Sequence, residues 1–228
     1  MRRVFLSFLI LILSAGGCYA SIAVSPVIIE DFDTVAGKVY TINILNETDR
    51  TQRLIVELGR FDQNEMGQIV YDEGIESREW AKGILDLPSE IVLEPKTANK
   101  LVVALKSAEF DSAFPVVFLK QNGGNISWRM AILFLLATGE IEGAVEYEFT
   151  GLSSSSILVT LRNIGMAHQA VWEEISYIDE YGDVLEKEDF LIGRILPGRS
   201  RQVILTPPSG TAYVEILGKR IELAELTR

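Results

Sequence analysis

The chain has 228 residues, a formal net charge of −11 and a single cysteine. An acidic chain disfavours nucleic acid and anionic membrane surfaces as partners. One cysteine and one histidine exclude an intramolecular disulfide and an ordinary zinc site. We therefore expect a fold stabilised by burial, with no metal and no other cofactor.

Segment 1–20 has the features of a secretory signal peptide. Two arginines precede the apolar run Val4–Leu13, small residues follow, and cleavage is expected before Ser21. The run is too short to span a bilayer. In a second interpretation Cys18 is lipidated, although Ala15 stands where lipoprotein signals usually have Leu. We expect a periplasmic or extracellular protein, held at a membrane only if Cys18 is lipidated.

Residues 21–228 show almost no helical periodicity. Short runs of β-branched, aromatic and apolar residues alternate with Gly, Pro, Asn and Asp about every eight to twelve residues, which is typical of all-β sandwiches. We expect two tandem Ig-like β-sandwich domains, 21–138 and 139–228, separated at the turn Ala137–Glu140. The expected strands are Ile22–Ile29, Lys38–Asn43, Arg53–Phe61, Ile69–Tyr71, Ile91–Leu93, Lys100–Leu105, Val116–Lys120, Ser127–Leu136, Gly143–Phe149, Ser156–Arg162, Ala170–Ile178, Val184–Leu185, Arg201–Thr206 and Ala212–Leu217.

An internal similarity relates the two halves. In each half an Asn ends a strand, an Asp follows sixteen residues later, and a Gly turn precedes the next strand. These residues are Asn46, Asp62 and Gly67 in the first half, and Asn163, Asp179 and Gly182 in the second. The pattern predicts related domains in which Asn caps a strand end and Asp with Gly makes a hairpin turn.

No motif of an enzyme or of a metal site stands out. The sole histidine, His168, lies in the loop Gly165–His168 and is interpreted as a solvated side chain, and no Gly-x-Ser-x-Gly elbow accompanies it. The stretch Asp62–Gly67 partly fits a calcium loop, but Met66 occupies a ligand position, so a hairpin turn is favoured. Glu173 and Glu174 point to opposite faces of a strand and suit a solvated acidic surface. We expect no enzyme.

The run Trp128–Leu136 stands above this background, because eight of its nine residues are apolar. One interpretation is a core strand, or one covered by the neighbouring domain. The other is an edge strand that accepts a strand from a partner. The candidate client-binding side chains are Trp128, Met130, Ile132, Phe134 and Leu136, with Ala131, Leu133 and Leu135 as the alternate set. On the binding interpretation, one of these sets is exposed in the monomer.

Read together, these segments resemble the periplasmic pilus chaperones (PapD-like proteins), mainly over the first domain. The matching residues are Val24, Ser25, Pro26, Ile28, Gly37, Ile44, Leu45, Asn46, Trp80, Pro88, Ile91, Leu93, Pro95, Val102 and the run Phe114–Leu119. The resemblance implies two Ig-like domains at an angle. It also implies that Trp128–Leu136 is the strand that such chaperones lend to a client.

One expected feature of that family is missing. Its members bind the client's terminal carboxylate with an Arg on the first strand and a Lys on the donating strand. Here Ser21–Val35 and Met130–Ala137 contain no basic residue, and Arg129 is the nearest. We expect a non-enzymatic chaperone that holds an exported protein client by β-strand addition. The alternative is a structural Ig-like component of the cell envelope or of a surface appendage, whose partner is an envelope protein.

Overall fold

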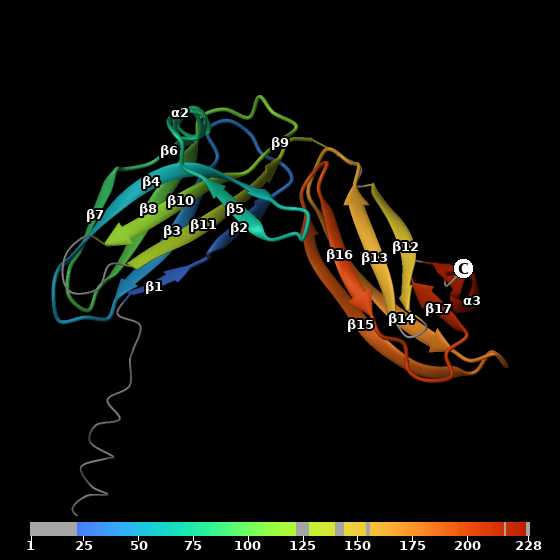
Figure 1. Ribbon diagram of the computed structural model, residues 1–228. Helices are drawn as coiled ribbons and strands as arrows, with labels where there is room; N and C mark the ends of the chain where they lie inside the picture. Colours follow the sequence, from blue (N-terminus) through green and yellow to red (C-terminus); the bar gives the residue numbers. More distant parts are fainter. Residues whose placement is uncertain (1–21, 122–127, 140–143, 154–155, 217, 227–228) are drawn as a thin grey trace, which may run out of the picture.

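The computed structural model describes residues 22–121, 128–139, 144–153, 156–216 and 218–226. The expected signal peptide, with Cys18, lies outside these residues. The four β-sheets divide along the chain into a first sandwich (22–137) and a second sandwich (145–222), which meet end to end at an angle (Figure 1). The boundary expected between Thr138 and Gly139 falls between β11 and β12. No helix in the described part of the chain is long and apolar enough to cross a membrane.

The first sandwich packs a four-stranded sheet on a seven-stranded one. The smaller sheet has the order β1 (Ile22–Ser25), β3 (Val39–Asn46), β8 (Ala98–Leu105), β6 (Leu85–Asp86). The larger has the order β2 (Ile28–Asp31), β11 (Trp128–Ala137), β10 (Pro115–Gln121), β4 (Gln52–Gln63), β5 (Ile69–Asp72), with β7 (Glu90–Leu93) beside β4 and β9 (Ser112–Ala113) beside β11. Alternate residues of both sheets, such as Ile42 and Val117, are fully buried between them.

The expected strand Ile22–Ile29 is two strands. β1 pairs antiparallel with β3 in the smaller sheet, whereas β2 pairs parallel with β11 in the larger one. The break falls at Pro26, which has no N–H to continue a ladder. The start of the chain therefore crosses from one sheet to the other, and only its second part reaches β11.

The helix α2 (Ile75–Ile84) is absent from the sequence expectation. It begins after Asp72, whose carboxylate accepts hydrogen bonds from the Gly74 N–H and the Ser77 hydroxyl. It packs on the core through little more than Ala81 and Ile84. An apolar stripe this narrow, on a helix of ten residues, is a weak signal among the strand-like runs around it.

The second sandwich packs a three-stranded sheet on a four-stranded one. Their orders are β12 (Val145–Ser153), β13 (Ser156–Asn163), β16 (Ser200–Leu205), and β15 (Val184–Ile195), β14 (Gln169–Ile178), β17 (Tyr213–Ile216), β18 (Lys219–Glu222), with a short helix α3 (Leu223–Leu226) at the end. Val159, Ile175 and Val214 are fully buried in its core. The turns expected at Gly67 and Gly182 are confirmed, since both glycines adopt positive φ (74° and 91°) between paired strands.

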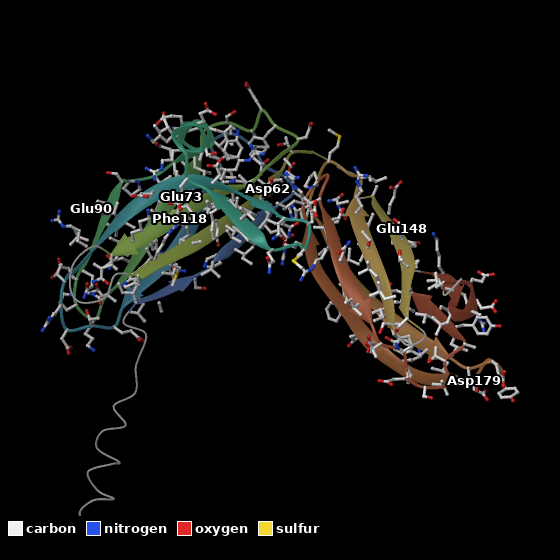
Figure 2. All side chains as sticks on the ribbon, viewed as in Figure 1. Asp62, Glu73, Glu90, Phe118, Glu148 and Asp179 are labelled. Atoms are coloured by element: carbon white, nitrogen blue, oxygen red, sulfur yellow. The ribbon has the colours of Figure 1, made fainter. Side chains whose placement is uncertain are left out.

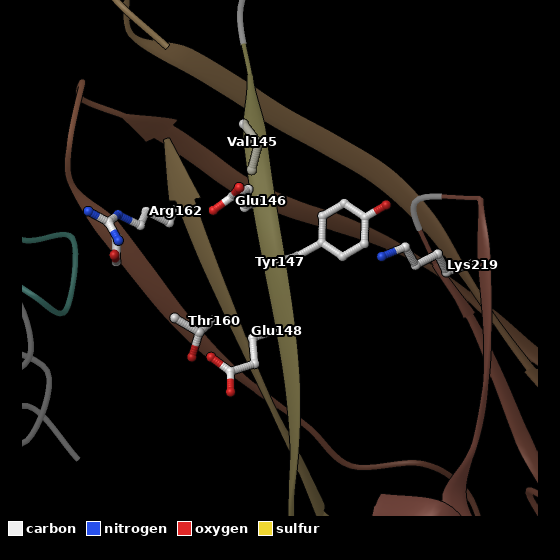
Figure 3. A pocket seen from close by; sticks show the side chains of 8 residues that line it. Val145, Glu146, Tyr147, Glu148, Thr160, Arg162 and Lys219 are labelled. Atoms are coloured by element: carbon white, nitrogen blue, oxygen red, sulfur yellow. The ribbon is translucent and has the colours of Figure 1, made fainter. Parts of the chain in front are cut away.

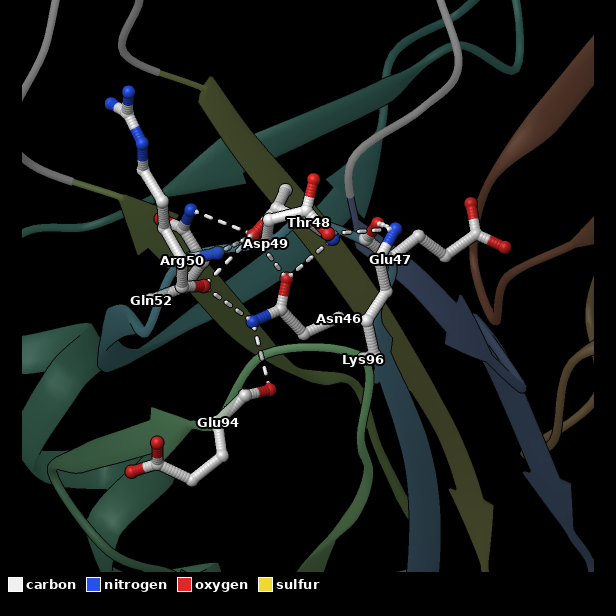
Figure 4. A network of polar contacts seen from close by, with 8 residues as sticks. All are labelled: Asn46, Glu47, Thr48, Asp49, Arg50, Gln52, Glu94 and Lys96. Atoms are coloured by element: carbon white, nitrogen blue, oxygen red, sulfur yellow. Dashed lines mark hydrogen bonds and ion pairs between the residues drawn. The ribbon is translucent and has the colours of Figure 1, made fainter.

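The internal similarity has a structural counterpart in two buried asparagines. Asn46 ends β3, and its amide donates to the carbonyls of Arg50 and Glu94 while its oxygen accepts from the Thr48 N–H (Figure 4). The same amide also donates to the Leu93 carbonyl. Asn163 ends β13 in the same way. Its amide donates to the carbonyls of Ala167 and Ile195, and its oxygen accepts from the Gly165 N–H. Each asparagine side chain thus supplies hydrogen-bond partners to backbone groups near a loop that have no partner in a neighbouring strand.

Candidate binding site

Strand β11 lies inside its sheet along one half and at the edge along the other. On one side it pairs with β10 from Trp128 to Leu133. On the other side β2 covers only Leu133–Leu136. No strand in the described part of the chain pairs with Trp128–Ile132 on that side, because β1 has crossed to the other sheet. We call this stretch the open edge.

The direction of the backbone groups follows from one hydrogen bond. The Leu133 N–H donates to the Val27 carbonyl at 3.0 Å, so Leu133 faces away from β10. Both polar backbone groups of a strand residue point to one side, and those of its neighbours to the other. The N–H and C=O groups of Arg129 and Ala131 therefore point out of the open edge. Met130 and Ile132 face β10.

The five candidate side chains share one face of β11, but the structure divides them. Ile132, Phe134 and Leu136 are fully buried in the core. Trp128 and Met130, on the open edge, are partly exposed. The expectation that a whole alternating set is exposed is wrong for this set, because the smaller sheet covers that face as far as Ile132. The Trp128 indole N–H also donates to the Gln121 side chain, which orients the ring.

The alternate set lies on the outer face of β11, and its exposure also decreases from the open edge toward the end of the strand. Leu135 is 3% exposed, in a cluster with Phe61, Val116 and Leu196, and Leu196 belongs to the second sandwich. Ala131 and Leu133 are only partly buried. The second sandwich therefore covers the end of this face, and the part beside the open edge remains accessible.

Charged side chains gather on the outer face next to the open edge. The Arg129 guanidinium lies 3.5 Å from the centroid of the Phe118 ring and 2.6 Å from a Glu73 oxygen (Figure 2 labels Glu73 and Phe118). Lys120 binds Glu57 and lies 3.4 Å from Glu73. Its hydrogen bond holds the pKa of Glu57 below the usual range. Both cations beside the edge are thus already paired within the protein.

His168 is not the solvated loop residue that the sequence suggests. It is fully buried, and its Nε2 atom lies 2.6 Å from the Glu30 carboxylate on β2. Sequence reasoning misses this, because the residues that cover His168 lie in the other half of the chain.

A surface hollow of about 620 Å³ lies along β12 in the second sandwich (Figure 3). Glu146 and Glu148 line it beside Arg162, and Lys219 lies 4.3 Å from the Tyr147 ring centroid. Charges of both signs on exposed strands are what a solvated surface shows, so the hollow supplies no second site. Among the described residues, no three His, Cys, Asp or Glu side chains gather as a metal site requires.

The comparisons with known proteins concern the fold. No family model matches the chain, and no curated protein matches its sequence. A chain from a structure of the chaperone–tip adhesin complex of CFA/I fimbriae biogenesis is 13% identical with a TM-score of 0.57, over 89% of this chain and 98% of that one. The class 5 fimbriae chaperone CfaA is 11% identical with a TM-score of 0.59, over 86% and 90%. The YadV chaperone is 9% identical with a TM-score of 0.52, over 89% and 97%.

These similarities extend over both sandwiches. The chain has the PapD-like fold of pilus chaperones, with two Ig-like β-sandwich domains. The resemblance drawn from the first half of the sequence is confirmed for the fold, and it reaches into the second half.

Proposed function

We propose that this protein is a periplasmic chaperone that holds an exported protein client by β-strand addition at the open edge of β11. The observation that carries the proposal is the row of outward backbone groups on Arg129 and Ala131, which β2 stops short of covering. The fold, which resembles that of fimbrial chaperones, supports it.

An added strand would find both backbone and side-chain partners at this edge. Four outward N–H and C=O groups could each contribute about 1 kcal/mol through a hydrogen bond. Trp128 and Met130 would contact alternate client side chains on the inner face, and Ala131 and Leu133 would contact the others on the outer face. The client segment that fits is therefore an extended strand with apolar side chains on both faces.

Carboxylate capture has less support here than strand addition. Lys120 and Arg129 are neighbours across β10 and β11, but Glu73 lies against both of them. A client carboxylate would have to displace this internal one. We therefore assign the affinity to the backbone edge.

The sharpest test is Ala131→Pro. The Ala131 N–H points out of the open edge and bonds to no strand among the described residues, so proline removes the donor offered to a client. We expect the melting temperature to change little and clients to be lost from the protein purified out of envelope extract. Mass spectrometry of the co-purifying proteins measures this.

Ile69→Pro is the matched control. The Asn64 N–H donates to the Gln68 carbonyl at 3.0 Å, so Gln68 faces β4 and Ile69 faces outward from edge strand β5. This variant should keep its clients. If Ala131→Pro keeps them as well, strand addition at β11 is wrong, and the structural envelope component becomes the better interpretation.

A further inference from the structure

His168 forms a contact between the two sandwiches. It lies in the loop between β13 and β14, yet its ring stacks on Phe32 at 4.5 Å between centroids and meets Phe114 edge-on at 6.3 Å. Phe32, Phe114 and the bonded Glu30 all belong to the first sandwich. The ring is fully buried between the two halves of the molecule.

The hydrogen bonds of the ring suit its neutral form. An ionised carboxylate can only accept a hydrogen bond, so the Nε2–H group of His168 donates to Glu30. In the neutral ring Nδ1 then carries a lone pair and no proton. Nδ1 is buried and has no hydrogen-bond partner among the described residues. Protonation would place an N–H there without an acceptor, which is costly in a buried site.

Two charged groups face the ring, one from each sandwich. Glu30 comes from β2, and Arg194, which binds the other oxygen of Glu30, comes from β15. Burial is the largest influence on the pKa of His168 and lowers it, whereas the hydrogen bond and charge of Glu30 raise it and the charge of Arg194 lowers it. The net effect is a pKa below the usual value. The hydrogen bond from Arg194 in turn keeps the pKa of Glu30 below its usual value. Of the three groups in this contact, His168 is the one that is uncharged, so its protonation adds a new positive charge at the buried ring.

A second contact lies toward the other end of the seven-stranded sheet. The Gln63 side chain donates to the Arg194 carbonyl at 2.8 Å and accepts from the Leu196 N–H at 2.9 Å. Beside it, the Arg199 Nε donates to Asp62 at 2.7 Å. Two strands, β11 and β10, separate β2 from β4 in the sheet order. The second sandwich is thus attached at the His168 contact, at the Gln63 contact, and through Leu196, which packs in a cluster with Leu135 and Val116 of the first sandwich. Of these contacts between described residues, only the first contains the histidine.

We propose that His168 is an acid-sensitive latch that fixes the angle between the two sandwiches while its ring is neutral and releases it when the ring is protonated. After release the contacts of Gln63 and Leu196 remain, and the second sandwich pivots about them. This inference stands apart from the proposed function, because it concerns the unliganded chain.

The direction of the pH effect follows from the lowered pKa of the seated ring. A free histidine takes up its proton near pH 6.5, and the seated one at a lower pH. The contact with the ring buried is therefore fully stable above pH 6.5. Its free energy becomes less favourable as the pH falls through the lowered pKa of His168. The latch is closed at neutral pH and opens in acid.

The first test uses the fact that the chain has one histidine, so its ring signals in an NMR titration need no assignment. We expect a single titration with a pKa below 6.5. In the unfolded chain in urea the same ring should titrate at the ordinary value. A pKa at or above 6.5 in the folded protein would overturn the latch.

The second test measures the distance between the sandwiches. Spin labels at Glu76→Cys on α2 and Glu180→Cys in the β14–β15 turn, in a Cys18→Ser chain, should give one narrow distance distribution at about pH 7.5. They should give a broader, shifted distribution at a pH below the midpoint of the NMR titration. The midpoint of this change should coincide with the NMR titration.

His168→Gln is the matched variant, because its amide can still donate to Glu30 but cannot take up a proton. It should keep the narrow distribution at both pH values, whereas His168→Ala should show the broad one at both. An unchanged distribution in the parent protein would overturn the proposal. So would a loss of the far-UV β-sheet spectrum at the lower pH, since acid would then unfold a domain and would not simply release this contact.

Discussion

Phe134→Glu should unfold the first sandwich. Phe134 is fully buried at the centre of β11, where its ring meets Tyr40 edge-on at 5.6 Å. An unpaired carboxylate in such a site costs several kcal/mol, out of a total stability of about 5–15 kcal/mol for a typical domain. Circular dichroism should show loss of β structure at room temperature, or a melting temperature lower by tens of degrees.

Met130→Glu is the matched control, on the same face of the same strand but on the open edge. Met130 is only partly buried, so the new carboxylate keeps contact with water. We expect the free energy of unfolding to fall by about 1 kcal/mol or less. Equal losses in the two variants would contradict the gradation from core to edge along β11.

The change from partly exposed to buried side chains along β11 is the part of the site that could not be predicted from the sequence. Trp128–Leu136 is almost uniformly apolar, so its composition fits a core strand and an edge strand equally well. The structure makes it both, because β2 runs beside Leu133–Leu136 and stops there. Where β2 ends depends on the crossing at Pro26, about a hundred residues away in the chain, and no local pattern encodes such a pairing.

His168 illustrates the same limit. From the residues around it, such as Gly165 and Met166, His168 is predicted to be a solvated loop residue. That prediction is correct for Met166, which is 54% exposed. His168 is buried only because Phe32 and Phe114 of the other sandwich meet it. Contacts between domains combine residues that share no sequence window, so a pattern search cannot find them.

The internal similarity could be predicted, because it is local in each half. An Asn at the end of a strand, followed by a turn, is a capping signal that a short segment carries complete. Asn46 and Asn163 both prove to be fully buried at strand ends, with their amides on loop carbonyls. Their burial raises the cost of losing them well above that of an exposed cap.

Asn46→Ala should therefore be strongly destabilising. It removes the donor to the carbonyls of Leu93 and Glu94 and the acceptor for the Thr48 N–H. Buried groups left without partners cost about 1–3 kcal/mol each, so we expect a loss of about 2–4 kcal/mol in the free energy of unfolding. In a domain of this size the melting temperature would fall by roughly 10–20 °C.

Asn43→Ala, on the exposed face of the same strand, should change the free energy of unfolding by less than about 0.5 kcal/mol. Denaturant unfolding of both variants measures the difference, and a loss as small for Asn46 as for Asn43 would mean that water satisfies this loop and that the asparagine is not its cap.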